Sequence, residues 1–153
     1  YLEQEKATLK TLTAKQCEQL AQCLDNWVLV DTYCTYILGV LWRWGVVSDA
    51  YMHQLAESDD LWKKRCAIVS TVALNQKARG GKGDTKRTID ICQKAIDDKR
   101  PLIAKAVSWA LRVLVAIDRN AVEEFLTANE NSLSKLVIRE VNNKLNTGLK
   151  NPN

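Results

Sequence analysis

A tryptophan and an aspartate lie four residues apart in an apolar stretch, Asn26-Trp27-Val28-Leu29-Val30-Asp31. On a helix this spacing places the indole and the carboxylate on one face, one turn apart. A carboxylate in such surroundings must find a partner, face a groove or lose its charge. In a groove it can stabilise a developing positive charge or orient a water molecule. The local sequence alone favours a simpler interpretation, in which Asp31 is a satisfied or exposed polar residue and Trp27 belongs to the core.

Two later stretches carry a guanidinium and a further indole at helical spacing. They read Trp62-Lys63-Lys64-Arg65 and Lys105-Ala-Val-Ser-Trp109-Ala-Leu-Arg112. An arginine can hold a phosphate through two parallel hydrogen bonds, and an indole offers a π face to a cation. Each residue also has a structural interpretation. Arg65 could form a salt bridge with Asp31, Trp109 could be core, and Arg112 could contact a phosphate or form a surface ion pair.

The cysteine and histidine content excludes several classes of site. The 153 residues include five cysteines and one histidine, His53, and no two cysteines form a Cys-x-x-Cys pair. This pattern fits neither a zinc site of the usual spacing nor a four-cysteine iron–sulfur cluster. Metal-dependent and Cys–His nucleophilic mechanisms are therefore excluded, and we expect no cofactor and no metal ligand. We expect the thiols to pack as small hydrophobic groups in a reducing cytoplasm.

The charged residues are unevenly distributed along the chain. Residues 1–59 hold 4 Lys/Arg against 8 Asp/Glu, whereas residues 60–119 hold 14 against 6. The basic middle third suggests a polyanionic partner, although a solvated helical surface rich in lysine is an equal alternative. No apolar stretch reaches the length of a membrane span, because Arg43 ends the longest one. The first residues lack a signal peptide and a methionine, so we expect further residues upstream of Tyr1.

The chain contains 6 glycines and 2 prolines, which leaves long windows compatible with helices. A capping box at Thr13-x-x-Gln16, a proline at the first helical position (Pro101) and a glycine after the last helix (Gly148) indicate helix ends. We also expect Asn120 to cap a short helix. No convincing strand is present, so we expect about eight helices joined by short loops. The expected helices cover residues 15–24, 27–42, 48–56, 61–76, from Asp84 or Thr85 to 97, 101–117, 120–128, and from Ser132 or Ser134 to 148. Residues 1–12 are expected to be the tail of a preceding helix.

The Gly-rich segment Ala78-Arg-Gly-Gly-Lys-Gly-Asp84 interrupts this helical pattern. It does not match a phosphate-binding P-loop, because no strand precedes it and no Gly-Lys-Ser/Thr follows. We interpret it as an exposed loop, with a secondary possibility that it contacts the backbone of a polyanion.

The helices recur in pairs, and a tryptophan lies in the second helix of three pairs. Trp27, Trp62 and Trp109 are separated by 35 and 47 residues, and the longer interval contains the Gly-rich loop. This spacing approximates the two-helix period of a HEAT-like solenoid. We therefore expect an all-α, HEAT-like helical-repeat domain over residues 1–153 in which the second helices line one continuous face. That face would carry Trp27, Asp31, Trp62, Arg65, Trp109 and Arg112.

Taken in order, the three stretches resemble the AlkD-like DNA alkylation repair family of HEAT-like DNA glycosylases. The resemblance runs from Asn26 to about Leu145 and includes Leu133-Ser-Lys135 and Arg139-Glu140. It implies that Asp31, Arg65, Trp27 and Trp109 form the active cleft. It also implies helices before the first motif, so we expect the chain to be truncated at its N-terminus relative to the family.

The implied reaction is hydrolysis of the N-glycosidic bond to a positively charged alkylated purine of the 3-methyladenine or 7-methylguanine type. A cationic base is a good leaving group, and a carboxylate near the sugar can stabilise the oxocarbenium-like transition state. We expect a monofunctional enzyme that acts on duplex DNA as a cytoplasmic monomer. The expected DNA-binding residues are Arg65, Arg112, Lys63, Lys105 and Lys64. Two alternatives stay open: an inactive HEAT-like DNA-binding module, and a helical scaffold for protein interactions.

Overall fold

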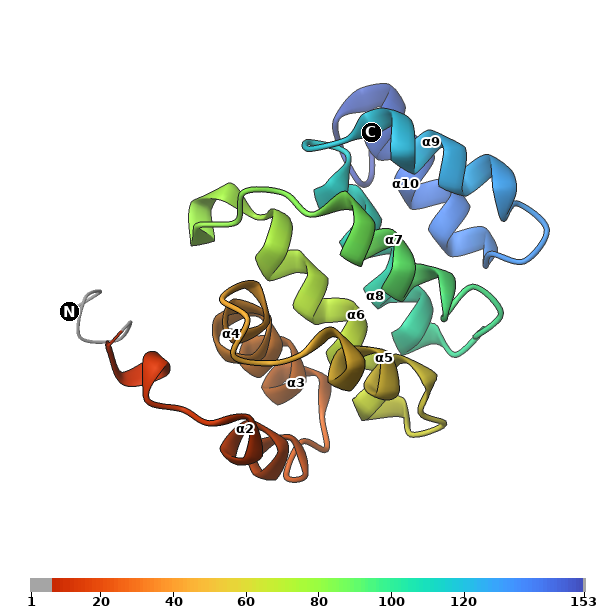
Figure 1. Ribbon diagram of the computed structural model, residues 1–153. Coiled ribbons are helices and arrows are strands. Elements are labelled where there is room, and N and C mark those ends of the chain that lie inside the picture. The colour runs from red at the N-terminus through yellow and green to blue at the C-terminus, as the bar shows by residue number, and fades with distance from the viewer. Residues whose placement is uncertain (1–6, 153) are drawn as a thin grey trace.

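The structure is a computed structural model and describes residues 7–152. This part of the chain is all-α and contains no strand, which confirms the predicted fold class (Figure 1). Its elements are α2 (Ala14–Ala21), α3 (Trp27–Tyr33), the π-helical segment η1 (Cys34–Leu38), α4 (Gly39–Arg43), α5 (Asp49–Glu57), α6 (Leu61–Asn75), the 3₁₀ turn η2 (Lys77–Arg79), α7 (Thr85–Gln93), α8 (Pro101–Leu114), α9 (Arg119–Ala128) and α10 (Lys135–Thr147).

The helices form antiparallel pairs that stack side by side, as in HEAT-like repeats. α6 packs against α3, η1, α4, α5 and α7, and it makes its most extensive contact with α8, which in turn packs against α10. The stack progresses from α2 at one end to α9 and α10 at the other (Figure 1). The second helices of successive pairs are therefore neighbours, which is the arrangement needed to bring residues from α3, α6 and α8 together.

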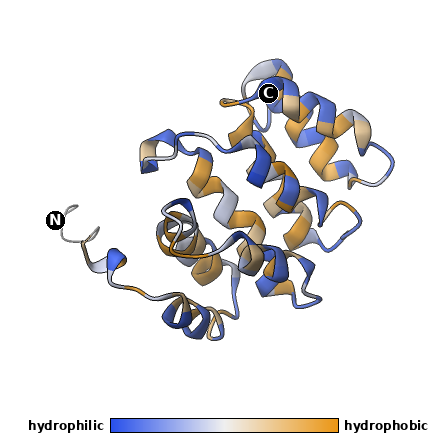
Figure 2. Cartoon of the chain, viewed as in Figure 1, coloured by the Kyte–Doolittle hydropathy of each residue, from blue (hydrophilic) through white to orange (hydrophobic). Residues whose placement is uncertain are grey.

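α6 is the central helix of the core. Every residue from Arg65 to Asn75 is buried, so this part of the helix is enclosed on all sides. One hydrophobic cluster extends from Cys17 to Leu145 and takes in α8 through Ile103, Val107 and Leu111. Orange, hydrophobic stretches lie where these helices face each other in Figure 2. A polar side chain on α6 is therefore held rigidly by its surroundings.

Side-chain caps fix most helix starts where the sequence indicates them. Thr13 and Gln16 form the predicted capping box, and Ser134 accepts a hydrogen bond from the backbone N–H of Val137. The predicted cap of α9 was wrong: Asp118, not Asn120, accepts from the N–H of Ala121. The aspartate two residues earlier makes the capping bond, so the helix begins at Arg119, ahead of Asn120.

Several predicted helices end earlier than their apolar pattern suggested. α2 ends at Ala21 rather than 24, α7 at Gln93 rather than 97, and α8 at Leu114 rather than 117. In each case the chain continues through turns that keep the following apolar residue against the core. The expected helix over residues 1–12 falls partly outside the described residues, of which 7–10 are helical.

A π-helical segment interrupts the long helix predicted over 27–42. The N–H of Gly39 bonds to the carbonyl of Cys34, five residues back, so one extra residue is accommodated. One residue corresponds to about 100° of rotation around the helix axis. Asp31 can therefore lie at the cleft described below while Leu41 and Trp42, farther along, are fully buried. Gly39 permits this packing, because a Cβ there would lie 2.5 Å from the carbonyl oxygen of Ser70.

All five cysteines are free, and only Cys23 is exposed. No helix in residues 7–152 is long and apolar enough to cross a membrane.

Candidate functional site

A cleft of about 470 Å³ lies where α3, α6 and α8 meet. It contains the four side chains expected to form the site (Trp27, Asp31, Arg65 and Trp109), which come from three separate stretches of sequence. We call it the candidate cleft. The other residues that line it are Leu102, Lys105, Arg112 and Lys150.

Asp31 and Arg65 form a two-fold hydrogen-bonded ion pair at the base of the candidate cleft. Arg65 Nε donates to Asp31 Oδ1 at 2.9 Å, and Arg65 Nη2 donates to Asp31 Oδ2 at 2.8 Å. The remaining terminal nitrogen, Nη1, donates to the backbone carbonyl of Leu102 at the start of α8. The side chains are 6% exposed for Arg65 and 16% exposed for Asp31. The pair is thus largely desolvated, and Asp31 is the partner that retains access to the cleft.

These contacts change the expected role of Arg65. Sequence reasoning allowed either a phosphate contact or a structural salt bridge with Asp31, and the structure contains the salt bridge. A guanidinium that spans a carboxylate and a carbonyl fixes both, because its five N–H donors lie in one rigid plane. Each carboxylate oxygen has a second lone pair. Asp31 therefore keeps accepting capacity beyond its contact with Arg65.

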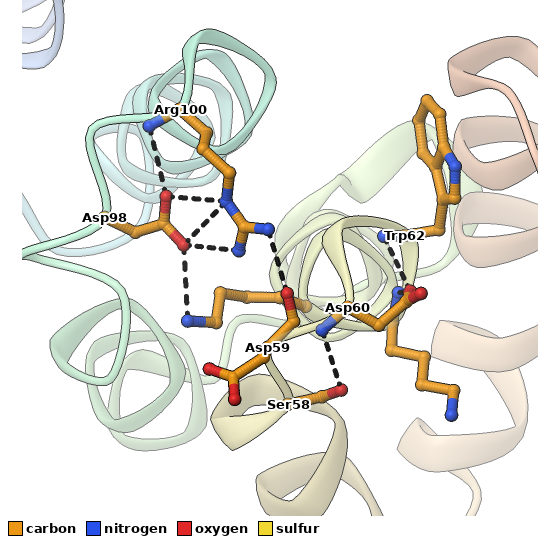
Figure 3. A network of polar contacts seen from close by, with 8 residues as sticks. Ser58, Asp59, Asp60, Trp62, Asp98 and Arg100 are labelled. Atoms are coloured by element: carbon orange, nitrogen blue, oxygen red, sulfur yellow. Dashed lines mark hydrogen bonds and ion pairs between the residues drawn. The ribbon is translucent and has the colours of Figure 1, made fainter.

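A polar network fixes the N-terminus of α6 and thereby the position of Arg65 (Figure 3). The carboxylate of Asp60 caps the helix by accepting from the N–H groups of Trp62 and Lys63, both at 2.9 Å. Arg100 donates to the carbonyl of Asp59 at 2.9 Å and is held by Asp98. The network thus ties the turn before α6 to the turn before α8.

Asp98 is the centre of this network. Its carboxylate lies 2.6 Å from Arg100 Nη2 and 3.2 Å from Lys64 Nζ. The hydrogen bond from Arg100, aided by that from Lys64, lowers the pKa of Asp98 to about 2. Asp98 therefore stays ionised throughout the neutral range, and both bases stay bound to it.

The two indoles differ in their surroundings. Trp27 is the first residue of α3 and is 56% exposed, whereas Trp109 is partly buried in the middle of α8. Lys105, Trp109 and Arg112 recur at helical spacing on α8, opposite the face that packs into the core. An exposed indole at a helix start loses hydrophobic stabilisation unless something covers it, so Trp27 is available to a ligand.

A buried glutamate organises the far rim of the candidate cleft. Glu140 on α10 accepts a 2.5 Å hydrogen bond from Ser108 and lies 3.2 Å from Lys150 Nζ. Burial raises the pKa of Glu140, but the hydrogen bond from Ser108 and the positive charge of Lys150 outweigh it, and the net shift is downward. Arg112 Nε donates to Ser108 Oγ at 3.1 Å. Glu140 thus holds two cationic side chains at the cleft.

One residue of the expected face, Trp62, and two of the expected DNA-binding residues, Lys63 and Lys64, lie elsewhere. Trp62 packs partly against the core, and Lys64 is engaged by Asp98. Lys63 lines a different cavity of about 250 Å³ with Glu18 and Tyr51. Conversely, sequence reasoning did not assign Lys150 or Leu102 to the site. Sequence analysis included Glu140 in the last motif, and this was the one sequence feature that pointed to a residue of the rim.

A second cavity of about 350 Å³ continues from the candidate cleft along α8. The two share Trp109, Arg112 and Lys150, and the second adds Lys77 and Lys144. The continuous groove therefore has lysines at several points along its length. The described residues include no group of three or more His, Cys, Asp or Glu side chains that could hold a metal ion.

The model of one protein family, described as DNA alkylation repair enzyme, matches residues 1–145. No curated protein and no solved structure matches the chain.

Proposed function

The chain belongs to the DNA alkylation repair enzyme family, and from this premise we propose that it is a monofunctional DNA glycosylase for positively charged N-alkylated purines. The observation that carries the proposal is the candidate cleft itself. It combines one accessible carboxylate, two indoles and a row of bases, the groups that this reaction needs.

The proposed chemistry begins with a base that is already cationic. Alkylation at a purine ring nitrogen makes the base a good leaving group, so no general acid is required. As the N-glycosidic bond breaks, positive charge develops on the deoxyribose, as in the oxocarbenium-like transition state of glycoside cleavage. Asp31 stabilises that charge and orients the attacking water. Arg65 acts as a positioning residue, because it fixes the carboxylate in one orientation.

The indoles and bases act on the rest of the substrate. Trp27 and Trp109 pack against the sugar of the lesion and offer π faces to the cationic base. Lys105, Arg112 and Lys150 contact backbone phosphates on the flanking nucleotides. Contacts of this kind hold the duplex in register but carry no sequence information, which suits an enzyme that must act on lesions at any position.

The test is incubation of the protein with duplex DNA treated with a methylating agent, followed by chromatography of the released bases. We expect release of 3-methyladenine or 7-methylguanine, leaving abasic sites without strand cleavage. An inactive DNA-binding module would bind the same duplex and release no base, and a protein-interaction scaffold would do neither. The absence of base release by the folded protein would overturn the proposal.

A further inference from the structure

A third basic cavity lies apart from the candidate cleft, beside the Gly-rich loop. It has a volume of about 700 Å³, shares no lining residue with the candidate cleft, and lies where α4 and α6 end and α7 begins. We call it the loop cavity. Five bases and one acid line it: Lys10, Arg43, Arg79, Lys82, Arg87 and Asp84.

Four of these bases have no carboxylate partner within residues 7–152. Only Arg87 forms ion pairs, with Asp49 at 2.7 Å and Asp84 at 3.5 Å. Arg43 Nη1 instead donates to two neutral acceptors, the carbonyls of Ala73 at 2.7 Å and Arg79 at 3.2 Å. Its burial lowers the pKa of Arg43, as expected for a cation that is desolvated without a counter-ion. Among the residues that the structure describes, the loop cavity thus carries a positive charge that no carboxylate compensates.

Arg79 has no carboxylate partner in the described part of the chain, and one of its nitrogens has no hydrogen-bond partner there either. Its guanidinium carbon lies 4.0 Å from the centre of the Tyr36 ring, so the group is held by stacking. Its Nη1 is buried and has no hydrogen-bond partner in the described part of the chain. A buried N–H without an acceptor is unfavourable. An anion that reached this position would remove the cost.

The loop that carries Arg79 and Lys82 is held in one shape by its glycines. Gly83 has φ of +97°, and a Cβ there would lie 2.6 Å from the side chain of Ile117. The N–H of Gly83 bonds to the carbonyl of Leu74 at 3.0 Å, and Asn75 accepts from the N–H of Asp84 at 2.8 Å. The bases are therefore presented from a fixed backbone, which lowers the entropic cost of binding a ligand.

We propose that the loop cavity is a second binding site and that it takes a phosphate group. Phosphate matches the planar donor geometry of arginine and can engage several bases at once, whereas a carboxylate satisfies fewer. Two sources share this chemistry: a phosphodiester of bound DNA, and the phosphate of a small molecule. Trp44 also lines the cavity and offers an aromatic surface beside the phosphate position.

The first experiment is calorimetric titration of the folded protein with inorganic pyrophosphate. We expect saturable binding that Arg79→Gln and Lys82→Glu each weaken by about 10-fold or more, the loss typical of one charge-assisted contact. The matched control is Lys86→Glu, because Lys86 is exposed on α7 and does not line the cavity. A second control is Lys105→Glu, which changes the charge of the candidate cleft. Both controls should bind pyrophosphate within about twofold of the parent, and thermal unfolding should show that every variant is folded.

Binding to an unmodified duplex then separates the two sources. If the ligand is a phosphodiester, pyrophosphate competes with DNA and Lys82→Glu lowers the salt-dependence slope by about one. If the ligand is a small molecule, pyrophosphate does not displace the duplex. Lys82→Glu then changes neither the affinity for the duplex nor its salt-dependence slope. Two results would overturn the proposal. One is the absence of pyrophosphate binding, and the other is binding that Lys105→Glu abolishes while Arg79→Gln and Lys82→Glu leave it unchanged. Because base release is not measured, this outcome is independent of the proposed glycosylase activity.

Discussion

At the scale of single residues, the pairing of Asp31 with Arg65 determines what the candidate cleft can do. A carboxylate that accepts two hydrogen bonds from one guanidinium is fixed in position. Fixed charges stabilise a transition state without reorganising during the reaction, which is why they are effective in catalysis. The same pair is also a structural element, because removing one partner leaves a buried charge unpaired. The two roles can be separated by experiment.

Replacement of Arg65 by Lys tests its role as a positioning residue. The charge is kept, but the fork that holds Asp31 and the Leu102 carbonyl is lost. We expect the excision rate to fall by about 10-fold or more, with a loss of about 1–3 kcal/mol in the free energy of unfolding. The slope of DNA affinity against salt should not change, since the donors of Arg65 are engaged within the protein. Excision at the parent rate by the folded variant would contradict a positioning role for Arg65.

The types of the site residues could be predicted from sequence, but their partners could not. The motifs singled out Trp27, Asp31, Arg65 and Trp109, and the structure places all four in one cleft. Whether Arg65 contacts a phosphate or Asp31 depends on the distance between α3 and α6, which no local pattern encodes. Lys150 escaped notice because it follows the last helix and reaches the cleft through a tertiary contact with Glu140.

At the scale of secondary-structure elements, the turn before α8 holds the N-terminus of α6 in place. Asp98 binds Arg100 and Lys64, and Arg100 bonds to the turn that precedes α6 (Figure 3). Helix starts could be predicted from their capping residues, whereas the π-helical segment could not. That segment depends on the close packing of Gly39 against α6, which is a long-range contact.

Replacement of Asp98 by Asn should destabilise the protein by about 1–2 kcal/mol at neutral pH, because two bases lose their partner. The pKa of Asp98 is lowered to about 2, below its ordinary value of 3.8. Its ionisation therefore stabilises the fold above pH ~4, and this contribution is lost as the pH falls toward ~2. The variant should show a weaker pH dependence of stability in this window by chemical denaturation.

The control for this prediction is Asp97→Asn. Asp97 is adjacent and exposed, so the same chemical change should alter stability by less than about 0.5 kcal/mol. Equal effects of the two substitutions at neutral pH would show that the network around Asp98 does not stabilise the fold.

At the scale of the whole molecule, most of the bases of the middle third that form no ion pair with the described residues lie in two places. Within residues 7–152, eight of the 14 bases in residues 60–119 form ion pairs, and six form none. Lys105 lies at the candidate cleft and Lys77 at its continuation, whereas Arg79 and Lys82 line the loop cavity. The excess of bases in this third could be read from the sequence, but the places where they stay unpaired could not, because ion pairing cannot be read from charge counts.

DNA affinity should therefore fall steeply as the salt concentration rises. The bases that line the candidate cleft and its continuation should account for part of the slope of affinity against salt. Lys105→Gln should lower the slope by about one and weaken binding equally for different sequences. Lys135→Gln is the matched control, since Lys135 is exposed at the start of α10 and lines none of the three basic cavities. Fluorescence anisotropy across a salt series measures the affinity and its slope for each variant. Affinity that does not change between low and moderate salt would rule out binding through the DNA backbone.

The most direct test of the account is single-turnover excision by Asp31→Asn, measured beside thermal unfolding of the same variant. The substitution keeps the size of the side chain and removes its charge. We expect base release to slow by roughly 10- to 1000-fold, the effect of losing ~1.4–4 kcal/mol of electrostatic stabilisation. DNA binding should persist, because a carboxylate repels phosphate. Asp25→Asn, which removes an exposed carboxylate just before α3, should release bases at the parent rate. A fully folded Asp31→Asn protein that also excises at the parent rate would contradict the mechanism.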